Sequence, residues 1–271
     1  MHPQAPIQAP IVVKVGTSVL TDGTRHIIRR RMLEIVRQVA HLHDQRRAVA
    51  LVSSGAIAAG REALAYPELD PSLPRKQMLA AVGQGRLIQI YSELFGIFGI
   101  TVGQVLLTRS DLSNPIGRLN ARNTLQTLFA YRVVPIINEN DTVATEEIQV
   151  GDNDNLSALV ADLVNAALLI LLTDQQGLFE ADPRTHPEAA LIPYVERIDE
   201  AVWARAGGTS SGLGTGGMVT KLQAAQFATQ RGTTTVIADG RLTDVIIRAV
   251  QGEAVGTTFA AQRQGERSVS P

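Results

Sequence analysis

Cysteine, long apolar runs and an excess of either charge are all missing from this chain of 271 residues. Without cysteine there is no disulfide, no thiolate nucleophile and no cysteine-based metal site, which fits a cytoplasmic location. No apolar run approaches the roughly 20 residues that a membrane-spanning helix needs. The formal net charge is −1, so no basic field attracts nucleic acid. We therefore expect neither a membrane nor a nucleic acid as a partner.

Aromatic residues are also scarce, at 4% of the chain, whereas hydrophobic residues make up 45%. Valine, isoleucine, leucine and alanine must therefore build the core. Such small and β-branched residues are typical of buried parallel strands that helices cover. The length suits one large α/β domain or two small ones.

Short apolar runs alternate with segments of helical periodicity along most of the chain. Expected strands are 11–15, 48–52, 102–107, 133–137, 167–172 and 235–238, and expected helices are 29–45, much of 55–98 with a break at 66–74, 116–131 and 155–166. This alternation predicts an α/β fold with an open, mostly parallel central sheet and helices on both faces.

A polar or glycine-rich cluster comes directly after each of four expected strands. The clusters are Gly16-Thr17-Ser18, Ser53-Ser54-Gly55, Asn138-Glu139-Asn140-Asp141 and Thr173-Asp174. Each cluster alone could be an ordinary polar loop. Ligands of open parallel sheets bind beyond the carboxyl ends of the strands, so the recurrence of such clusters predicts one shared site.

Lys14 lies inside the first apolar strand, one residue before that strand ends. A buried lysine is costly unless it has a negative partner, although a lysine on an edge strand can extend its ammonium group to water. Gly16 and two hydroxyl residues follow, and such a turn can direct backbone N–H groups at a phosphate. We therefore expect Lys14 to face an anion.

Two carboxylates and two amides crowd the start of the helix expected near residue 155, at positions 152–155. A helix cap needs only one such residue. A calcium-binding loop is excluded, because its sixth position would be Ser157 instead of glycine and its twelfth would be Leu163 instead of glutamate. The surplus polar groups predict substrate or catalytic contacts.

The glycine-rich segment 212–221 is the most chemically suggestive stretch of the chain. Its glycines allow a phosphate to approach backbone N–H groups closely, and Lys221 follows about one turn into the next helix. It is not a Walker loop, because Met218 stands where that motif requires lysine. We expect this segment to bind a phosphate.

The same segment also imitates a dinucleotide-binding fingerprint. Gly212, Gly214 and Gly217 fit the G-x-G-x-x-G spacing, and Asp239 follows about 20 residues later. Such a fingerprint needs an apolar strand before it, whereas residues 206–211 are small and polar. A dinucleotide-dependent oxidoreductase is therefore a disfavoured alternative.

Taken together, eight segments resemble the glutamate 5-kinase branch of the amino acid kinase family. They occur in family order at 12–20, 53–62, 103–109, 138–141, 150–159, 172–175, 181–184 and 212–221. The resemblance implies a three-layer α/β sandwich. It also implies ATP-dependent phosphorylation of the γ-carboxylate of glutamate, which gives glutamate 5-phosphate and ADP in the first step of proline biosynthesis.

Residue roles follow from the resemblance at the matching positions. The implied catalytic residues are Lys14, Lys221 and Asp154, with Asp154 orienting both lysines. The implied substrate-binding residues are Ser54, Gly55, Asp141, Asp152 and Asn153, with Asp141 suited to the α-ammonium group. The implied ATP-binding residues are Lys14, Gly16, Thr173, Asp174, Thr215, Gly216, Gly217, Met218 and Lys221. ATP and Mg²⁺ are the implied cofactors, and no metal ligand is assigned.

The resemblance also implies an organisation and further partners. We expect a disordered leader at 1–10, a kinase domain at 11–260 and a flexible tail at 261–271, without the C-terminal PUA domain that many relatives carry. A homodimer or homotetramer and feedback inhibition by proline are expected. Because an acyl phosphate product reacts with water, we also expect the segments 66–78 and 175–190 to cover the site. Two alternatives remain: a sister kinase for acetylglutamate, aspartate, carbamate or a nucleoside monophosphate, and a catalytically silent amino-acid sensor.

Overall fold

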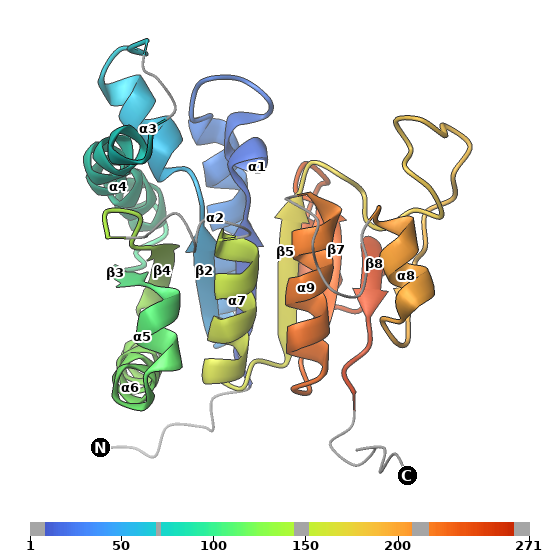
Figure 1. Cartoon of the computed structure of the whole chain (residues 1–271). Coiled ribbons are helices and arrows are strands. Elements are labelled where there is room, and N and C mark those ends of the chain that lie inside the picture. Colours follow the sequence, from blue (N-terminus) through green and yellow to red (C-terminus); the bar gives the residue numbers. More distant parts are fainter. Residues whose placement is uncertain (1–8, 69–71, 144–151, 208–216, 263–271) are drawn as a thin grey trace.

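The described residues form one twisted sheet of eight strands in the order β3-β4-β2-β1-β5-β7-β8-β6 (Figure 1). The structure is a computed structural model that describes residues 9–68, 72–143, 152–207 and 217–262. The strands are β1 (Ile11–Val15), β2 (Val49–Ser53), β3 (Val102–Leu107), β4 (Val134–Glu139), β5 (Leu168–Thr173), β6 (Tyr194–Val195), β7 (Thr234–Asp239) and β8 (Gly256–Phe259).

Strands β3, β4, β2, β1, β5 and β7 are parallel to one another. Strand β8 pairs antiparallel with β7, and β6 pairs parallel with β8. The prediction of an open, mostly parallel sheet is therefore confirmed. The two strands of the mixed edge were missed, because the short runs at 194–195 and 256–259 carry no clear apolar pattern.

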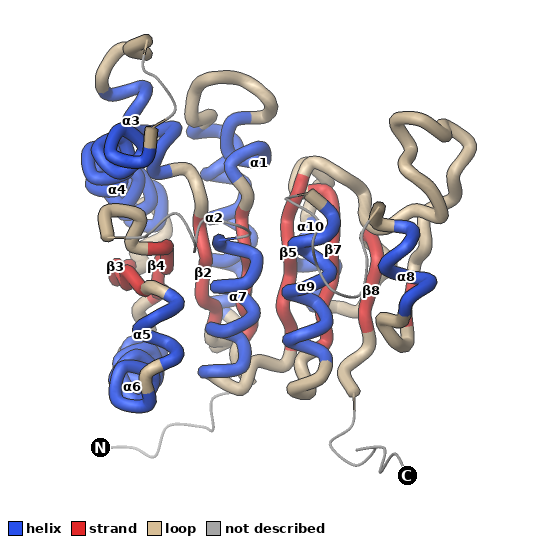
Figure 2. Tube along the Cα trace, in the orientation of Figure 1, coloured by secondary structure: helices blue, strands red, loops and turns tan. Residues whose placement is uncertain are grey.

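Helices cover both faces of the sheet (Figure 2). They are α1 (Thr17–Thr21), α2 (Arg29–Asp44), α3 (Ala56–Ala63), α4 (Leu73–Gly96), α5 (Arg109–Ser113), α6 (Pro115–Ala130), α7 (Asp152–Leu163), α8 (Glu200–Arg205), α9 (Met218–Thr229) and α10 (Val245–Val250). One core lies between the sheet and α2, α4 and α10, and the other lies between the sheet and α6, α7 and α9. This is the three-layer sandwich that the sequence predicts.

Side-chain alternation in the central strands decides which core each residue joins. In β1, Ile11, Val13 and Val15 belong to the core beneath α2, whereas Val12 belongs to the core beneath α7. Because successive strand residues point to opposite faces, Lys14 lies on the same face as Val12. The lysine is therefore directed toward α7.

Helix α7 begins at Asp152, three residues earlier than the helix predicted at 155–166. The polar residues 152–155 thus lie in the first helical turn instead of in a loop before it. Successive residues of a helix are turned by about 100° around its axis. Neighbouring side chains in this turn can therefore reach different parts of the site.

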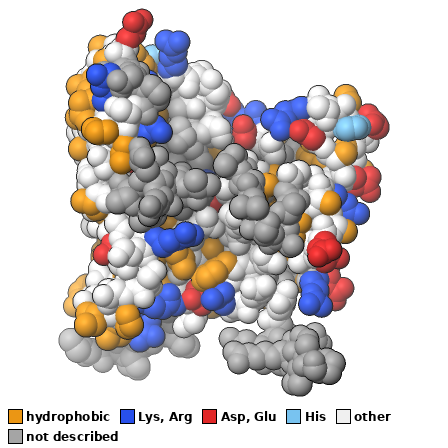
Figure 3. Space-filling view, viewed as in Figure 1, with side chains coloured by type: hydrophobic (Ala, Val, Ile, Leu, Met, Phe, Trp, Pro, Cys, Tyr) orange, Lys and Arg blue, Asp and Glu red, His pale blue; other side chains and the backbone are white. Residues whose placement is uncertain are grey.

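The outer surface carries charges of both signs. Figure 3 shows lysine, arginine, aspartate and glutamate side chains interspersed over the face that it presents. None of the described helices combines the length and apolarity that crossing a lipid bilayer would need. Residues 1–8 and 263–271 lie outside the described part of the chain, so the expected leader and tail stay predictions.

Candidate active site

The predicted polar clusters meet at one edge of the sheet. Strands β4, β2, β1 and β5 are parallel neighbours in this order, so their carboxyl ends lie side by side at the upper edge in Figure 1. Ser53 closes β2, Glu139 closes β4 and Thr173 closes β5. The topology therefore brings these clusters together at one edge of the sheet.

Lys14, Asp154 and Lys221 form an ionic group at this edge, which we call the transfer centre. The Nζ atom of Lys14 lies 2.7 Å from Oδ1 of Asp154, and Nζ of Lys221 lies 3.2 Å from Oδ2. Lys14 is only 6% exposed and Asp154 only 3%. Strand β1 is central, so Lys14 is not an edge-strand lysine reaching for water; its negative partner is Asp154.

Thr220 completes the transfer centre and was missed as a site residue. Its Oγ1 donates a hydrogen bond of 2.8 Å to Oδ2 of Asp154, the same oxygen that Lys221 contacts. Both residues lie in the first turn of α9, which begins after Gly217. Thr220 stands inside the matching segment 212–221, and its place next to Lys221 was the available signal.

Asp154 is held in its ionised form. Burial acts to raise the pKa of its carboxyl, but the ammonium groups of Lys14 and Lys221 and the Thr220 hydroxyl outweigh burial, so the pKa lies below its usual range. Two ammonium groups against one carboxylate leave an excess of positive charge. The transfer centre can therefore attract and orient an anion at the edge of the sheet.

Amides and a hydroxyl form a second, uncharged group beside the transfer centre, which we call the acceptor network. Nδ2 of Asn153 donates to Oγ of Ser54 and to Oδ1 of Asn138, both at 2.8 Å. Nδ2 of Asn138 in turn donates to Oε1 of Gln84 on α4, also at 2.8 Å. Asn138 and Gln84 were not predicted as site residues. Asn138 stood in a recognised cluster, whereas Gln84 gave no local signal.

A cavity of about 380 Å³ opens against the acceptor network. It is lined by Thr17, Ser54, Gly55, Ala56, Ile57, Ala58, Arg61, Asn138, Glu139, Asp141 and Asn153. This acceptor cavity thus gathers the predicted residues Ser54, Gly55, Asp141 and Asn153. Asp152 is the first residue of α7, and its side chain lies outside the described part of the structure.

Gly55 shapes the entrance to helix α3 on the cavity wall. Its φ is +109°, which L side chains rarely adopt, and a Cβ there would lie 2.9 Å from a methyl group of Leu20. Gly16 plays a related part beside the transfer centre, because a Cβ at Gly16 would lie 3.6 Å from Nζ of Lys14. Gly55 is therefore required by its backbone conformation and by the packing of Leu20, whereas Gly16 places its backbone close to the Lys14 ammonium group.

The ends of β5 and β7 form the side expected to hold ATP. Oγ1 of Thr173 donates to Oδ1 of Asp174 at 3.1 Å, and Gly240 N–H donates to the carbonyl of Thr173 at 2.8 Å. Arg241, which the sequence did not single out, donates to the carbonyl of Asp174 and to Oδ2 of Asp239 at 2.8 and 2.7 Å. These contacts fix the turn after β5.

The remaining expected nucleotide residues are placed only in part. Thr215 and Gly216 lie outside the described residues, whereas Gly217 precedes α9 with φ +70° and Met218 opens that helix. The described residues before the glycine-rich segment form helix α8, not the strand of a dinucleotide site. Asp239, which would have to bind a ribose there, is paired with Arg241.

No group of three or more His, Cys, Asp or Glu side chains that could hold a metal ion occurs within the described residues. The loop between β5 and β6, which contains 175–190, projects beyond the carboxyl edge of the sheet (Figure 1). Segment 66–78 is described except for 69–71. A role of either segment as a cover stays a prediction.

Solved structures with this fold include two small-molecule kinases. Carbamate kinase from Giardia lamblia bound to AMP-PNP superimposes with a TM-score of 0.66 at 17% identity, over 94% of this chain and 99% of that one. UMP kinase from Ureaplasma parvum gives 0.64 at 14% identity, over 93% and 99%. At such low identity these likenesses show the fold alone.

Sequence comparison is more specific. A glutamate 5-kinase of Klebsiella pneumoniae (strain 342) is 58% identical over 252 residues, which are 93% of this chain and 69% of that protein. A glutamate 5-kinase of Shewanella amazonensis is 58% identical over 251 residues, or 93% and 66%. The family model described as amino acid kinase family matches residues 9–239. The chain belongs to the amino acid kinase family.

Proposed function

We propose that this protein transfers the γ-phosphoryl group of ATP to the γ-carboxylate of glutamate, giving glutamate 5-phosphate and ADP at the first step of proline biosynthesis. The observation that carries the proposal is the transfer centre of Lys14, Asp154 and Lys221 beside a preformed acceptor cavity. The relatives named glutamate 5-kinase at 58% identity support glutamate as the acceptor.

The chemistry requires charge compensation more than proton transfer. A glutamate side chain has a reference pKa of about 4.3, so the nucleophile is ionised at neutral pH and needs no general base. A carboxylate oxygen forms a bond to the γ-phosphorus while the bond from that phosphorus to the bridging oxygen of ADP breaks. Phosphoryl transfer depends mainly on positioning and charge stabilisation. Lys14 and Lys221 supply positive charge, and Asp154 holds both ammonium groups in place.

The acceptor cavity suits a small zwitterionic ligand. Asp141 on its wall offers a carboxylate to the α-ammonium group of glutamate, and Ser54, Gly55 and Asn153 line the same wall. The Asn153 amide is already bound to Ser54 and Asn138, so little side-chain ordering is left for the moment of binding. Asp152 is proposed as a further contact from the start of α7.

The nucleotide is proposed to bind along the ends of β5 and β7 and the start of α9. Thr173 and Asp174 lie at the end of β5, where Arg241 and Gly240 hold the backbone of their turn. Gly16, Thr215, Gly216, Gly217 and Met218 complete the proposed phosphate-binding and nucleotide-binding set. Lys14 and Lys221 would contact the phosphates from the transfer centre.

Mg²⁺ is proposed to enter with ATP. Asp154 is a poor ligand for it, because two ammonium groups already compensate its carboxylate. Such an arrangement, without a carboxylate cluster among the described residues, fits an ion held chiefly by phosphate oxygens and water. When bound, Mg²⁺ would neutralise part of the phosphate charge.

Other acceptors are the main alternative, because the fold does not choose a substrate. Proteins with this fold include a UMP kinase, a carbamate kinase and an isopentenyl phosphate kinase. Glutamate is favoured over these acceptors by the relatives at 58% identity. A silent sensor is disfavoured by the intact transfer centre, and an oxidoreductase by helix α8 before the glycine-rich segment.

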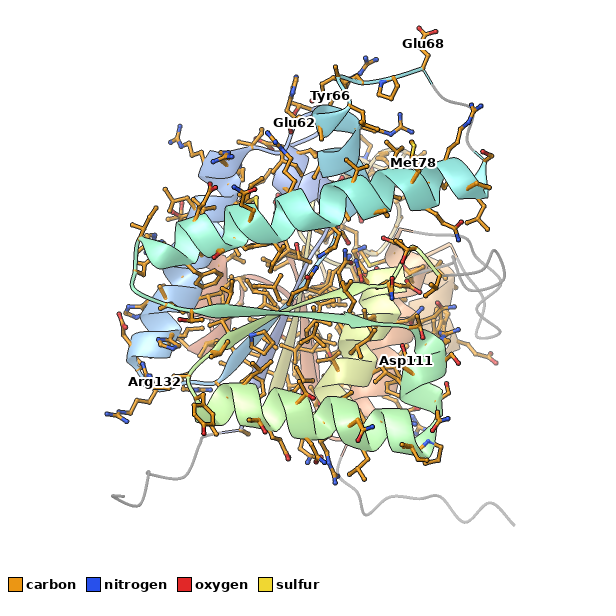
Figure 4. The ribbon with its side chains drawn as sticks, turned by 90° about the vertical axis from the view of Figure 1, so that its left-hand side faces the viewer. Glu62, Tyr66, Glu68, Met78, Asp111 and Arg132 are labelled. Carbon is orange, nitrogen blue, oxygen red and sulfur yellow. The ribbon has the colours of Figure 1, made fainter. Side chains whose placement is uncertain are left out.

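Assembly, regulation and location belong to the same proposal. A homodimer or homotetramer is supported by exposed apolar residues on α4, directly after it and on the edge strand β3, among them Val82, Ile97 and Leu106. Met78 on α4 is another such residue (Figure 4). Light scattering on the purified chain would test this. Proline as inhibitor, a cytoplasmic location and a kinase domain at 11–260 stay predictions.

The deciding experiment measures ADP release with glutamate, acetylglutamate and aspartate as acceptors, together with trapping of the acyl phosphate by hydroxylamine. We expect ADP release and a hydroxamate with glutamate, and much less of both with the other two. Equal or faster turnover of acetylglutamate or aspartate would contradict the proposed acceptor. ADP release without hydroxamate would contradict transfer to a carboxylate.

A further inference from the structure

The acceptor cavity has an uneven distribution of charge on its wall. Among its described lining residues, Glu139 and Asp141 carry carboxylates, and Arg61 alone carries a positive charge. The transfer centre supplies further positive charge, but Lys14 and Lys221 are already in contact with Asp154. The positive group on the cavity wall itself therefore belongs to helix α3.

Helical spacing directs Arg61 to the cavity. Ile57, Ala58 and Arg61 all line it, and residues three and four apart lie on one face of a helix. Helix α3 starts after the left-handed turn at Gly55, which sets its first residues on the same wall. The turn at Gly55 thus positions both Ser54 and the helix that carries Arg61.

A second cavity, of about 540 Å³, adjoins the first and shares Thr17, Ala58 and Arg61 with it. Its remaining lining residues are Thr21, Thr24, Arg25, Tyr66, Pro67 and Glu68. Figure 4 shows Tyr66 and Glu68 on the segment that continues from α3, above α4. Arg61 therefore stands on the boundary between the acceptor cavity and a hollow that leads away from it.

Arg61 also differs from those arginines whose guanidinium groups are held by carboxylates. Arg29, Arg31 and Arg37 each form an ion pair with a carboxylate. Within the described part of the chain, Arg61 forms no such pair. An ordinary explanation is that a cation in the last turn of α3 suits the negative end of the helix dipole. That explanation does not account for its place on the wall of two cavities.

Glutamate brings three charged groups to the acceptor cavity. In the proposed function the γ-carboxylate faces the transfer centre and the α-ammonium group faces Asp141. The α-carboxylate then remains, on a wall that already carries Glu139 and Asp141, and it would be repelled there without a cation. A guanidinium group is suited to this task, because its planar fork binds a carboxylate with two parallel hydrogen bonds.

We propose that Arg61 binds the α-carboxylate of the acceptor and thereby makes the site specific for amino acids with a free α-carboxylate. The proposal rests on the proposed function and adds to it the residue that recognises the α-carboxylate end of the substrate. Asp141 and Arg61 would then recognise the two charges of the amino-acid backbone, and the transfer centre the side-chain carboxylate.

The test compares glutamate with its α-amide, which keeps the α-ammonium and the γ-carboxylate but has an uncharged carboxamide in place of the α-carboxylate. Wild type should prefer glutamate. In Arg61→Ala, we expect kcat/KM for glutamate to fall about 10- to 100-fold through KM, because a hydrogen-bonded charge pair is lost. The α-amide should be nearly unaffected and KM for ATP unchanged. Arg61→Lys should recover part of the preference.

Arg25→Ala is the matched control, because Arg25 lines only the second cavity. This variant should keep the wild-type preference for glutamate over the α-amide. The proposal is overturned if Arg61→Ala keeps that preference, or if it loses activity equally with both acceptors, as a purely structural role would produce. Failure of the proposed function would give a different result, because wild type would then release no ADP with glutamate. That result would also overturn the proposed role of Arg61.

Discussion

Asn153 and Asp154 are consecutive residues in the first turn of α7, yet they contact two regions of opposite character. Asp154 reaches the charged transfer centre, where two lysines contact its carboxylate. Asn153 reaches the uncharged acceptor network of Ser54 and Asn138. One helical turn thus positions both the group proposed to bind phosphate and the group that lines the acceptor cavity, and fixes the distance between them.

The two regions differ in how their polar groups are stabilised. The transfer centre is stabilised by two ion pairs that share the Asp154 carboxylate, so removal of that carboxylate leaves both lysines without their partner. The acceptor network satisfies its amides by neutral hydrogen bonds, each of which contributes roughly 1 kcal/mol. We therefore expect damage to the transfer centre to lower turnover and damage to the acceptor side to raise KM for the acceptor.

Lys221→Ala should give the largest effect on activity. It removes a preorganised positive charge from the phosphate side of the site, and loss of one such donor lowers kcat by roughly 10²- to 10³-fold. Steady-state kinetics at saturating ATP and glutamate would measure this. Arg248→Ala, which breaks the exposed pair between Arg248 on α10 and Glu253 beyond it, should leave kcat unchanged. Near-normal turnover of Lys221→Ala would remove this lysine from the transfer centre.

Asp154→Asn should lower both turnover and stability. The uncharged amide no longer compensates two neighbouring ammonium groups, and breaking a buried ion pair costs roughly 3–5 kcal/mol. Thermal unfolding and kcat, measured on the same preparation, would show both losses. A variant that keeps its stability but loses turnover would mean that the lysines do not depend on Asp154 for their charge compensation.

Asp162→Asn is the matched control for that variant. Asp162 lies in the last turn of the same helix, where it pairs with Arg118 at 2.6 Å. At a rise of about 1.5 Å per residue it is more than 10 Å along the axis from Asp154. Its loss should affect stability slightly and leave kcat and both KM values unchanged. A fall in kcat for Asp162→Asn would show that α7 itself had shifted.

Asp141→Asn should affect the acceptor cavity instead of the transfer centre, and its effect on activity should be smaller. It removes the charge proposed to face the α-ammonium group, so we expect KM for glutamate to rise about tenfold or more while kcat and KM for ATP change little. Initial rates over a grid of both substrates would separate these constants. A rise in KM for ATP instead would place Asp141 on the nucleotide side.

Much of the division between the transfer centre and the acceptor network could be predicted from the sequence, because it follows from local patterns. Apolar runs that stop at Gly16 or Ser53 predict strand ends, and strand ends at one edge predict a site. The polar surplus at 152–155 predicted more than a helix cap. That surplus was placed before the helix instead of inside it, and only its place within α7 directs Asn153 and Asp154 to different partners.

Contacts between distant segments could not be predicted in this way. Gln84 reaches Asn138 from the middle of α4, and nothing near Gln84 in the sequence indicates it. Strand β8 depends on Gly256, where a Cβ would lie 2.1 Å from the carbonyl oxygen of Ile237. Such close approaches arise from packing and leave no periodic pattern.

The smallest expected effect concerns pH, because the contribution of Asp154 to the stability of the fold should not change near neutral pH. The folded-state pKa of Asp154 lies below its unfolded value of about 3.9, because the lysines favour the carboxylate. A group with a depressed folded pKa contributes stability above its unfolded pKa and loses that contribution as pH falls through the folded value. The stabilisation by Asp154 should therefore be constant from about pH 5 to 8.

Thermal unfolding of wild type and Asp154→Asn at a series of pH values would measure this contribution as a difference between the two melting temperatures. The difference should stay constant between about pH 5 and 8 and become smaller only below about pH 4. A difference that changes between pH 5 and 8 would mean that Asp154 titrates there. The two lysines would then not hold its charge, and the electrostatic contrast between the transfer centre and the acceptor network would be lost.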